Sequence, residues 1–225
     1  MPDTPDTDRE WLVNQIAHAL RNPIFAASVQ TETLHLKAGD SEAVRIAADK
    51  LHGQLRRLSG NIDEMLLFGR PLRTHLAEVP VAELVSALSE RYRLGDRQDP
   101  AQITCGEIDP SLSGRWDRNA VTVILERILD NAVQHTEPPH TIRINARRDG
   151  DAGVILSVED TGNGIDPEIL DRVLQPFFPQ HSGRQGLGLA IADKFARALG
   201  GRVEIESASD HGTTVSCILP LNSNE

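Results

Sequence analysis

One histidine near the start of the chain stands where imidazole chemistry is expected. His18 lies in the stretch HALRNPI, early in a segment that is rich in helix-forming residues. Neutral imidazole is nucleophilic near pH 7 and needs little change of its pKa. The apolar positions around it form a helical stripe that leaves out His18, so we expect the ring to point toward solvent. A surface histidine without a special role would give the same pattern.

Two glycine-rich stretches further along have the form of ligand-binding turns. EDTGNGID (159–166) directly follows an apolar segment, which places Asp160 at the end of a predicted strand. Gly162 and Gly164 let the backbone turn close to a ligand, and the carboxylate can accept a hydrogen bond from an exocyclic amine such as that of adenine. In the second stretch, glycines precede a predicted helix whose free backbone N–H groups form a phosphate site: Gly183, Gly186 and Gly188. Each pattern alone is weak, because turn-forming glycines after strands are common.

A helix expected over 119–135 adds an amide oxygen. Its stretch ERILDNAVQHT contains Asn131, a suitable ligand for Mg²⁺ when phosphates and water supply the remaining oxygens. Taken alone, an asparagine on a helix is usually a solvated residue.

The N-terminal segment that must position the histidine follows a helical pattern. Residues 9–69 alternate apolar and polar residues and contain one proline, Pro23. KAGDSEA (37–43) supplies a glycine and then an N-cap, Asp40 or Ser41, which predicts a helical hairpin. Its second half carries a heptad seam formed by Val44, Ala48, Leu51, Leu55, Leu58, Ile62 and Met65.

A lone hairpin would leave most of this apolar seam exposed. Two copies packed as a four-helix bundle would bury it, so we expect a homodimer. The hairpin could instead pack on the rest of its own chain.

The remainder of the chain has a mixed pattern. GRPLRTHLAEVP (69–80) interrupts the helical rhythm with one glycine and two prolines and is interpreted as a linker. Beyond it the alternation of short strands and helices predicts a layered α/β sandwich. Helices are expected at 81–93, 119–135 and 187–199, and strands at 102–107, 114–117, 141–148, 153–160, 202–209 and 213–220.

Bulk composition excludes several classes of function. The 225 residues carry a formal net charge of −10, which argues against nucleic acid or an anionic membrane as the main partner. No apolar run approaches the roughly 20 residues of a membrane span, and the acidic N-terminus is unlike a signal peptide. Cys105 and Cys217 match no metal-ligand spacing and are interpreted as reduced thiols. A cytoplasmic protein is expected.

The order and spacing of the three stretches resemble the N, G1 and G2 boxes of the histidine-kinase branch of the GHKL ATPase superfamily. PFFP (176–179) resembles the F box, HALRNPI the H box, and MLLFGRP (65–71) the exit of the second bundle helix. The resemblance extends over the chain from Glu10. It implies a HisKA-like dimerisation and phosphoacceptor hairpin at 9–70, followed by an α/β two-layer sandwich of the Bergerat (GHKL) ATPase fold at 76–225.

The same resemblance implies an ATP-dependent protein-histidine kinase of a two-component system. The phosphoryl group of ATP would pass to His18 and then to an aspartate in the receiver domain of a response regulator. Asn22, one turn beyond His18, corresponds to a polar residue associated with removing phosphate from the regulator. ATP and Mg²⁺ are the implied cofactors, with Asn131 as the metal ligand. The implied nucleotide-binding residues are Arg127, Asn131, His135, Asp160, Gly162, Gly164, Gly186, Leu187 and Gly188.

Three departures from the family pattern favour weak kinase activity. Ala19 stands where an acid usually helps to withdraw the imidazole proton, help that is typically worth about 10²–10⁴-fold in rate. Arg127 replaces the usual first asparagine of the N box and could either face the triphosphate or point away. Gln134 stands where a lysine often meets the phosphates. The alternative is therefore a degenerate kinase that acts as a phosphatase, phosphotransfer protein or scaffold on a response regulator.

Two further expectations concern the lid and the signal. PQHSGRQ (179–185) is expected to be a mobile loop that orders over the nucleotide. The sequence carries no recognisable sensor segment, so an upstream sensor protein or a missing sensor domain is expected as a further partner. A GHKL ATPase of the gyrase or chaperone type is disfavoured, because such proteins need no histidine-bearing hairpin before the sandwich.

Overall fold

The computed structural model describes most of the chain. The described residues are 4–37, 41–94, 102–136, 141–150, 153–178 and 186–223, and only the backbone is described for 4–15, 17–19, 37 and 94. They fall into two compact units, one formed by the first two helices and the other by the residues from Leu72 onward.

The first unit is a pair of antiparallel helices, α1 (Thr4–Lys37) and α2 (Glu42–Gly69). Helix α1 is continuous through Pro23, and α2 begins after Ser41, whose extended backbone (φ −81°) marks the N-cap. Polar pairs tie the helices together in one register: Arg21 forms an ion pair with Asp63, and His35 Nδ1 lies 3.0 Å from Asp49 Oδ1.

The heptad seam of α2 divides into two rows. Ala48, Leu55 and Ile62, spaced seven residues apart, are buried within the unit. The row at Val44, Leu51 and Leu58 is 36%, 46% and 47% exposed. Several apolar residues of α1 are exposed as well, namely Ile16, Leu20, Phe25, Val29, Leu34 and Leu36. One chain therefore covers only half of the apolar surface that the heptad pattern provides.

The second unit is built on a mixed five-stranded sheet with the order β2-β4-β5-β7-β6. Strand β2 runs parallel to β4, and the other neighbours are antiparallel. The strands are β2 (Gln102–Ile108), β4 (Thr141–Asp149), β5 (Gly153–Asp160), β6 (Arg202–Ser207) and β7 (Thr213–Pro220). Strand β5 lies at the centre of the sheet, and most of its side chains are buried. It pairs with β4 on one side and with β7 on the other along its whole length, so both of its ends are held by neighbouring strands.

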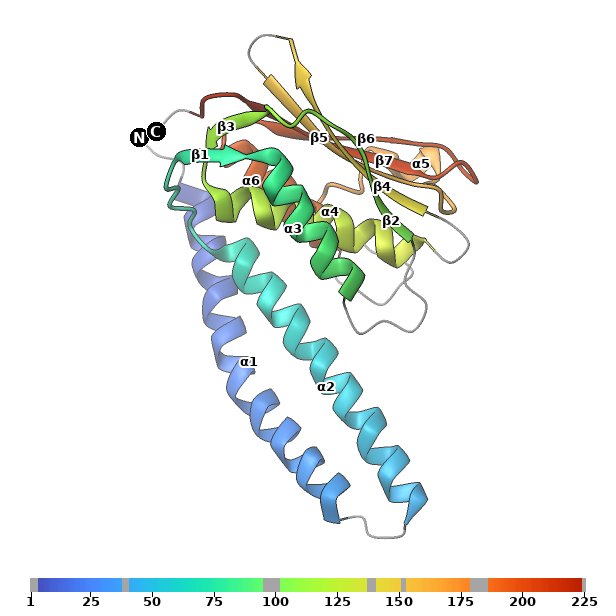
Figure 1. Ribbon diagram of the computed structural model, residues 1–225. Coiled ribbons are helices and arrows are strands. Elements are labelled where there is room, and N and C mark those ends of the chain that lie inside the picture. The colour runs from blue at the N-terminus through green and yellow to red at the C-terminus, as the bar shows by residue number, and fades with distance from the viewer. Residues whose placement is uncertain are drawn as a thin grey trace. The chain divides into compact units, whose positions relative to one another are not determined.

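Three helices cover one face of this sheet (Figure 1): α3 (Val81–Leu94), α4 (Arg118–His135) and α6 (Gly188–Ala198). Helix α4 lies beside α6 and packs on the central strands β5 and β7. Its buried face is apolar and is formed by Ala120, Val121, Ile124, Leu125, Ile128, Leu129 and Ala132. Helix α5 (Pro167–Leu170) is a single turn capped by Asp166, whose Oδ1 accepts a hydrogen bond from the Glu168 backbone N–H at 2.9 Å. This two-layer arrangement (Figure 1) confirms the predicted α/β sandwich.

The predicted linker at 69–80 needs a correction at its end. Ala77–Pro80 form strand β1, which pairs antiparallel with β3 (Ser113–Trp116). The glycine and prolines of this segment indicate irregular backbone, but Pro80 ends the strand and Val79 is 1% exposed in the core. The domain boundaries 9–70 and 76–225 stay predictions.

None of the described helices is long and apolar enough to cross a membrane.

Candidate functional site

Asp160 ends the central strand β5 and is almost fully buried, at 4% exposure. Burial raises the pKa of its carboxyl above the usual value, while hydrogen bonds from the backbone N–H groups of Gly162 and Thr213 partly oppose the rise. The Gly162 N–H lies 2.9 Å from Asp160 Oδ1. Thr136 Oγ1 is buried beside this carboxyl and has no well-aligned hydrogen-bond partner among the described residues. A buried acceptor next to a buried hydroxyl is a suitable pair for a ligand that carries an amine and a ring nitrogen.

The loop after Asp160 needs glycine at two positions because other backbones press against it. A Cβ at Gly162 would lie 2.3 Å from the carbonyl oxygen of His135, the last residue of α4. Gly164 has a φ of +70°, and its Cβ would lie 2.0 Å from the carbonyl oxygen of Ala208. The loop is therefore held between the end of α4 and the turn that joins β6 to β7.

Helix α4 carries the residues of the predicted N box. Asn131 is half-buried on this helix. Arg127 Nη1 lies 3.5 Å from Asp130 Oδ2, and Tyr92 Oη donates a hydrogen bond to Asp130 Oδ1 at 2.8 Å. Burial and the charge of Asp130 raise the pKa of Tyr92 far above its usual value, so the phenol stays a donor. Part of the Arg127 charge is thus balanced by a neighbour on its own helix.

The start of α6 is the third part of the site. Gly186 has a φ of +66°, and a Cβ there would lie 2.0 Å from the carbonyl oxygen of Phe178. Phe178 is buried, and the Arg172 guanidinium stacks over its ring at 4.7 Å. Leu187 is fully buried at the N-cap position, whereas the space beside Gly188 is open. Open backbone N–H groups at the start of an eleven-residue helix suit an anion.

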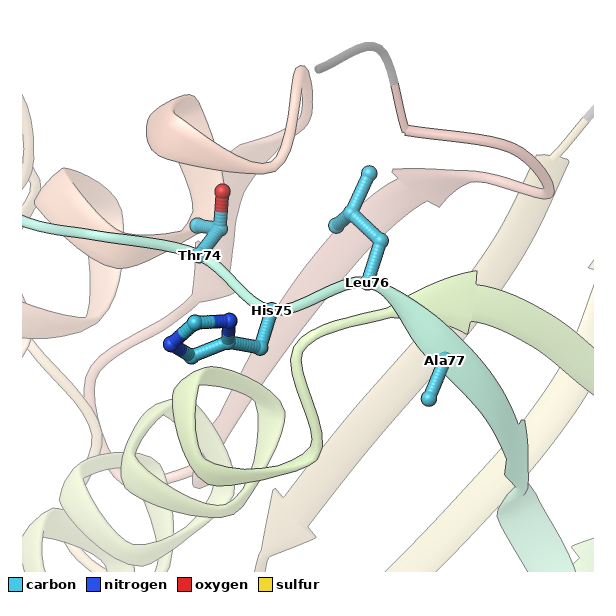
Figure 2. A pocket seen from close by; sticks show the side chains of 4 residues that line it. All are labelled: Thr74, His75, Leu76 and Ala77. Carbon is cyan, nitrogen blue, oxygen red and sulfur yellow. The ribbon is translucent and has the colours of Figure 1, made fainter.

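A separate cavity of about 480 Å³ lies along the segment that leads into β1. Figure 2 shows its described lining residues, Thr74, His75, Leu76 and Ala77, none of which belongs to the predicted nucleotide set. The backbone N–H of His75 donates to Asp117 Oδ2 at 2.7 Å, and Asp117 Oδ1 caps α4 by accepting from the Ala120 N–H at 3.0 Å. This segment is therefore fastened to the first turn of α4.

The structure brings together part of the residue set predicted from the sequence. Asp160, Gly162 and Gly164 adjoin the end of α4 at His135, whose carbonyl packs against Gly162. Asn131 and Arg127 lie on the same helix, and Gly186, Leu187 and Gly188 lie at the start of α6.

The predicted phosphoacceptor lies in the other unit. His18 and Asn22 belong to α1; the side chain of His18, like that of Ala19, lies outside the described part, while Asn22 is exposed. Gly183 and the predicted lid at 179–185 also lie outside the described residues.

Sequence reasoning missed the polar residues that support Asp160. Thr136, Thr213 and Ser207 reach the loop from α4 and from the β6–β7 hairpin. Strand β7 pairs with β5 and places Thr213 opposite Asp160. Pairing between strands that are distant in the chain cannot be read from a single sequence, so no local pattern pointed to Thr213.

Residues 116–223 match the family model described as histidine kinase-, DNA gyrase B-, and HSP90-like ATPase. This part of the chain is a GHKL ATPase domain. The matched residues include α4, α6 and four of the five strands of the sheet. Asp160 lies at the end of the central strand, β5. The GHKL catalytic core predicted from the glycine boxes is thereby confirmed, whereas the family model does not extend to the helical hairpin.

Relatives of the GHKL domain are histidine kinases. The chain is 30% identical over 223 residues to the sensor-like histidine kinase SenX3 of Mycobacterium tuberculosis, which covers 94% of this chain and 53% of SenX3. It is 28% identical over 212 residues to the signal transduction histidine-protein kinase AtoS of Escherichia coli, covering 94% of this chain and 34% of AtoS. The chain thus spans about half the length of SenX3 and about a third of that of AtoS.

Solved structures share the fold. Full-length ShkA, crystallised in complex with AMPPNP, matches 95% of this chain and 46% of its own with a TM-score of 0.73 and 22% identity. The catalytic domain of histidine kinase ThkA matches 66% of this chain and 99% of its own with a TM-score of 0.59 and 24% identity.

Proposed function

We propose that the protein is a histidine kinase core that binds ATP and Mg²⁺, phosphorylates His18, and passes the phosphoryl group to an aspartate of a response regulator. The observation that carries the proposal is the presence, in one chain, of a GHKL ATPase domain and a helical pair whose first helix contains His18. The sequence pattern predicts that this histidine lies outside the apolar stripe. Relatives that are named histidine kinases support the same function.

The adenine base is assigned to the buried end of β5. The Asp160 carboxylate would accept a hydrogen bond from the exocyclic amine, and the Thr136 hydroxyl is placed to complete the polar pairing. Gly162 and Gly164 let the loop beside Asp160 pack against the carbonyls of His135 and Ala208, which holds the backbone next to the base. Binding of AMPPNP by ShkA, which has a similar fold, supports this assignment.

The phosphates are assigned to the space between α4 and the start of α6. The backbone N–H groups beside Gly186, Leu187 and Gly188 would face the triphosphate, and Asn131 would hold Mg²⁺ together with phosphate oxygens. The metal would supply charge neutralisation on the phosphates. Arg127 would act indirectly, since Asp130 already balances part of its charge.

The transfer step is a displacement at phosphorus. A ring nitrogen of His18 forms a bond to the γ-phosphorus while the bond to the bridging oxygen of ADP breaks, and the imidazole proton leaves to solvent. Ala19 supplies no base for that proton, so we expect a slow reaction. Positioning and charge neutralisation account for most of the catalysis of such transfers.

A homodimer completes the proposal. The exposed row at Val44, Leu51 and Leu58 repeats every seven residues, which is the spacing that a second copy of the hairpin would cover in a four-helix bundle.

Incubation of the full chain with Mg²⁺ and γ-labelled ATP tests the function directly. We expect an acid-labile, alkali-stable label that disappears in His18→Gln and persists in His35→Gln, a matched change further along the same helix. Ala19→Glu is expected to accelerate labelling by about 10²-fold, the lower end for general-base help. No label on a chain that binds ATP would contradict the kinase proposal.

A phosphatase is the second candidate, and the exposed position of Asn22 favours it. Asn22 lies one turn beyond His18 on α1, where an amide could position a water for attack on a phosphorylated regulator. The test is loss of label from a phosphorylated receiver domain. If the amide orders the water, Asn22→Ala should slow this dephosphorylation at least about tenfold, as expected for the loss of one positioning contact. Gln30→Ala, at another exposed position of the same helix, should leave the rate unchanged.

A further inference from the structure

Ser207 is the last residue of β6, and its hydroxyl joins three segments of backbone. Its Oγ accepts a hydrogen bond from the Ile165 N–H at 2.8 Å and donates to the Gly212 carbonyl at 2.9 Å. Thr213 Oγ1 lies at 2.9 Å. A hydroxyl has one proton and two lone pairs, so with its proton on Gly212 it accepts from both Ile165 and Thr213 and its capacity is full.

Other contacts reach the same loop from the turn between β6 and β7. The Asp210 N–H donates to the Asn163 carbonyl at 2.7 Å, and Gly164 packs against the Ala208 carbonyl. At its far end, Gly212 has a φ of +82°, and a Cβ there would lie 2.0 Å from the Asp160 carbonyl oxygen. The turn thus follows the whole loop from Asp160 to Ile165.

Ser207 is the side-chain link in this arrangement. The Asp160 carboxyl is held on one side by Gly162, within the loop, and on the other by the backbone N–H of Thr213. Since Ser207 binds the loop through Ile165 and the β7 strand through Gly212 and Thr213, it fixes the spacing between the two donors that orient the carboxylate. Removing the hydroxyl leaves the Ile165 N–H without its acceptor and loosens this end of the loop, although the hydrogen bond from the Asp210 N–H to the Asn163 carbonyl remains.

We propose that Ser207 is a positioning residue of the nucleotide site, which sets the Asp160 loop for the adenine base without touching the nucleotide. The assignment rests on the proposed binding of ATP by this domain. Because the loop lies at the end of the site that is assigned to the base, loss of the hydroxyl lowers the affinities for ATP and for adenosine by the same factor.

Titration calorimetry of the full chain with ATP and with adenosine tests this role. Ser207→Ala is expected to weaken both ligands about fivefold to tenfold, the equivalent of one hydrogen bond. Ser207→Thr, which keeps the hydroxyl, restores wild-type affinity. Ser209→Ala, at an exposed position in the same turn, is the matched control and leaves both affinities unchanged.

Exchange of the Ile165 amide proton, followed by NMR without ligand, gives an independent measure. Ser207→Ala is expected to accelerate the exchange of this proton about tenfold. In Ser207→Thr the exchange rate is expected to equal that of the wild type. Unchanged exchange in Ser207→Ala would overturn the assignment, as would a loss of affinity for ATP but not for adenosine. Failure of the wild-type chain to bind ATP would instead overturn the proposed function, and the assignment with it.

Discussion

At the scale of single residues, the site depends on one buried carboxyl and on glycines at positions where a side chain would meet neighbouring backbone. Asp160 is the stronger acceptor when it is ionised, yet burial favours its neutral form. The N–H groups of Gly162 and Thr213 counteract burial by stabilising the charge. The balance between these effects determines the pH range in which the base can bind.

Adenosine binding should therefore weaken in mildly acidic solution. The pKa of Asp160 lies above that of an ordinary aspartate, about 3.9, so protonation weakens the acceptor at a higher pH than for an exposed carboxyl. Calorimetry with adenosine, which has no phosphates to titrate, should show affinity falling as the pH drops through the raised pKa. In Asp160→Asn the weaker remaining affinity should not change over this range. A wild-type affinity that stays constant down to about pH 4 would contradict the role of Asp160.

Alanine variants at two glycines distinguish the cost of backbone strain from the cost of a steric clash. Gly150 and Gly164 both have positive φ, but only Gly164 has a carbonyl oxygen, that of Ala208, where a Cβ would stand. Gly150→Ala should cost about 1–2 kcal/mol of unfolding free energy, the strain of a left-handed residue. Gly164→Ala should cost more, because the loop must also move. Urea unfolding measures both, and equal losses would show that the contact with Ala208 does not matter.

At the scale of elements, the two helices of the hairpin are only half covered. Leu55 is buried against α1, whereas Leu51, one turn away on the same seam, is 46% exposed. A dimer would bury the second row and gain about 25 cal/mol for each Å² of apolar surface removed from water.

A charge introduced at Leu51 should therefore disrupt the proposed dimer, whereas a charge at a neighbouring polar position should not. Leu51→Glu places a charge in the proposed interface and should convert a dimer into a monomer at micromolar concentration, as measured by sedimentation. Gln54→Glu adds the same charge at an exposed polar position and should leave the dimer intact. A wild-type chain that sediments as a monomer would contradict the proposed bundle.

Most elements of the second unit could be predicted because their signals are local. Strand β5 and helix α6 carry their own apolar periodicity and begin at glycines, and their observed bounds lie within one residue of those expected. Strand β1 was missed because its four residues are defined by pairing with β3, more than 30 residues away. Ser207 was missed for the same reason: its acceptor role exists only once the β6–β7 hairpin meets the loop after β5.

At the scale of the whole molecule, the proposed function gives the two units separate tasks. The GHKL domain would supply the nucleotide site, and the hairpin would supply the histidine and the predicted dimer interface. Neither unit holds both reactants, so the reaction requires an intact Asp160 and an intact His18 in the same assembly. This requirement distinguishes a histidine kinase from an ATPase that merely carries a helical extension.

Mapping the phosphorylated residue by mass spectrometry at neutral to alkaline pH, after incubation with Mg²⁺ and ATP, is the most direct test. The account predicts phosphate on His18 in the wild-type chain, and none in either His18→Gln or Asp160→Asn, although both variants keep the wild-type far-ultraviolet circular dichroism. Phosphate on another residue, or on His18 in a folded Asp160→Asn variant that no longer binds ATP, would contradict it.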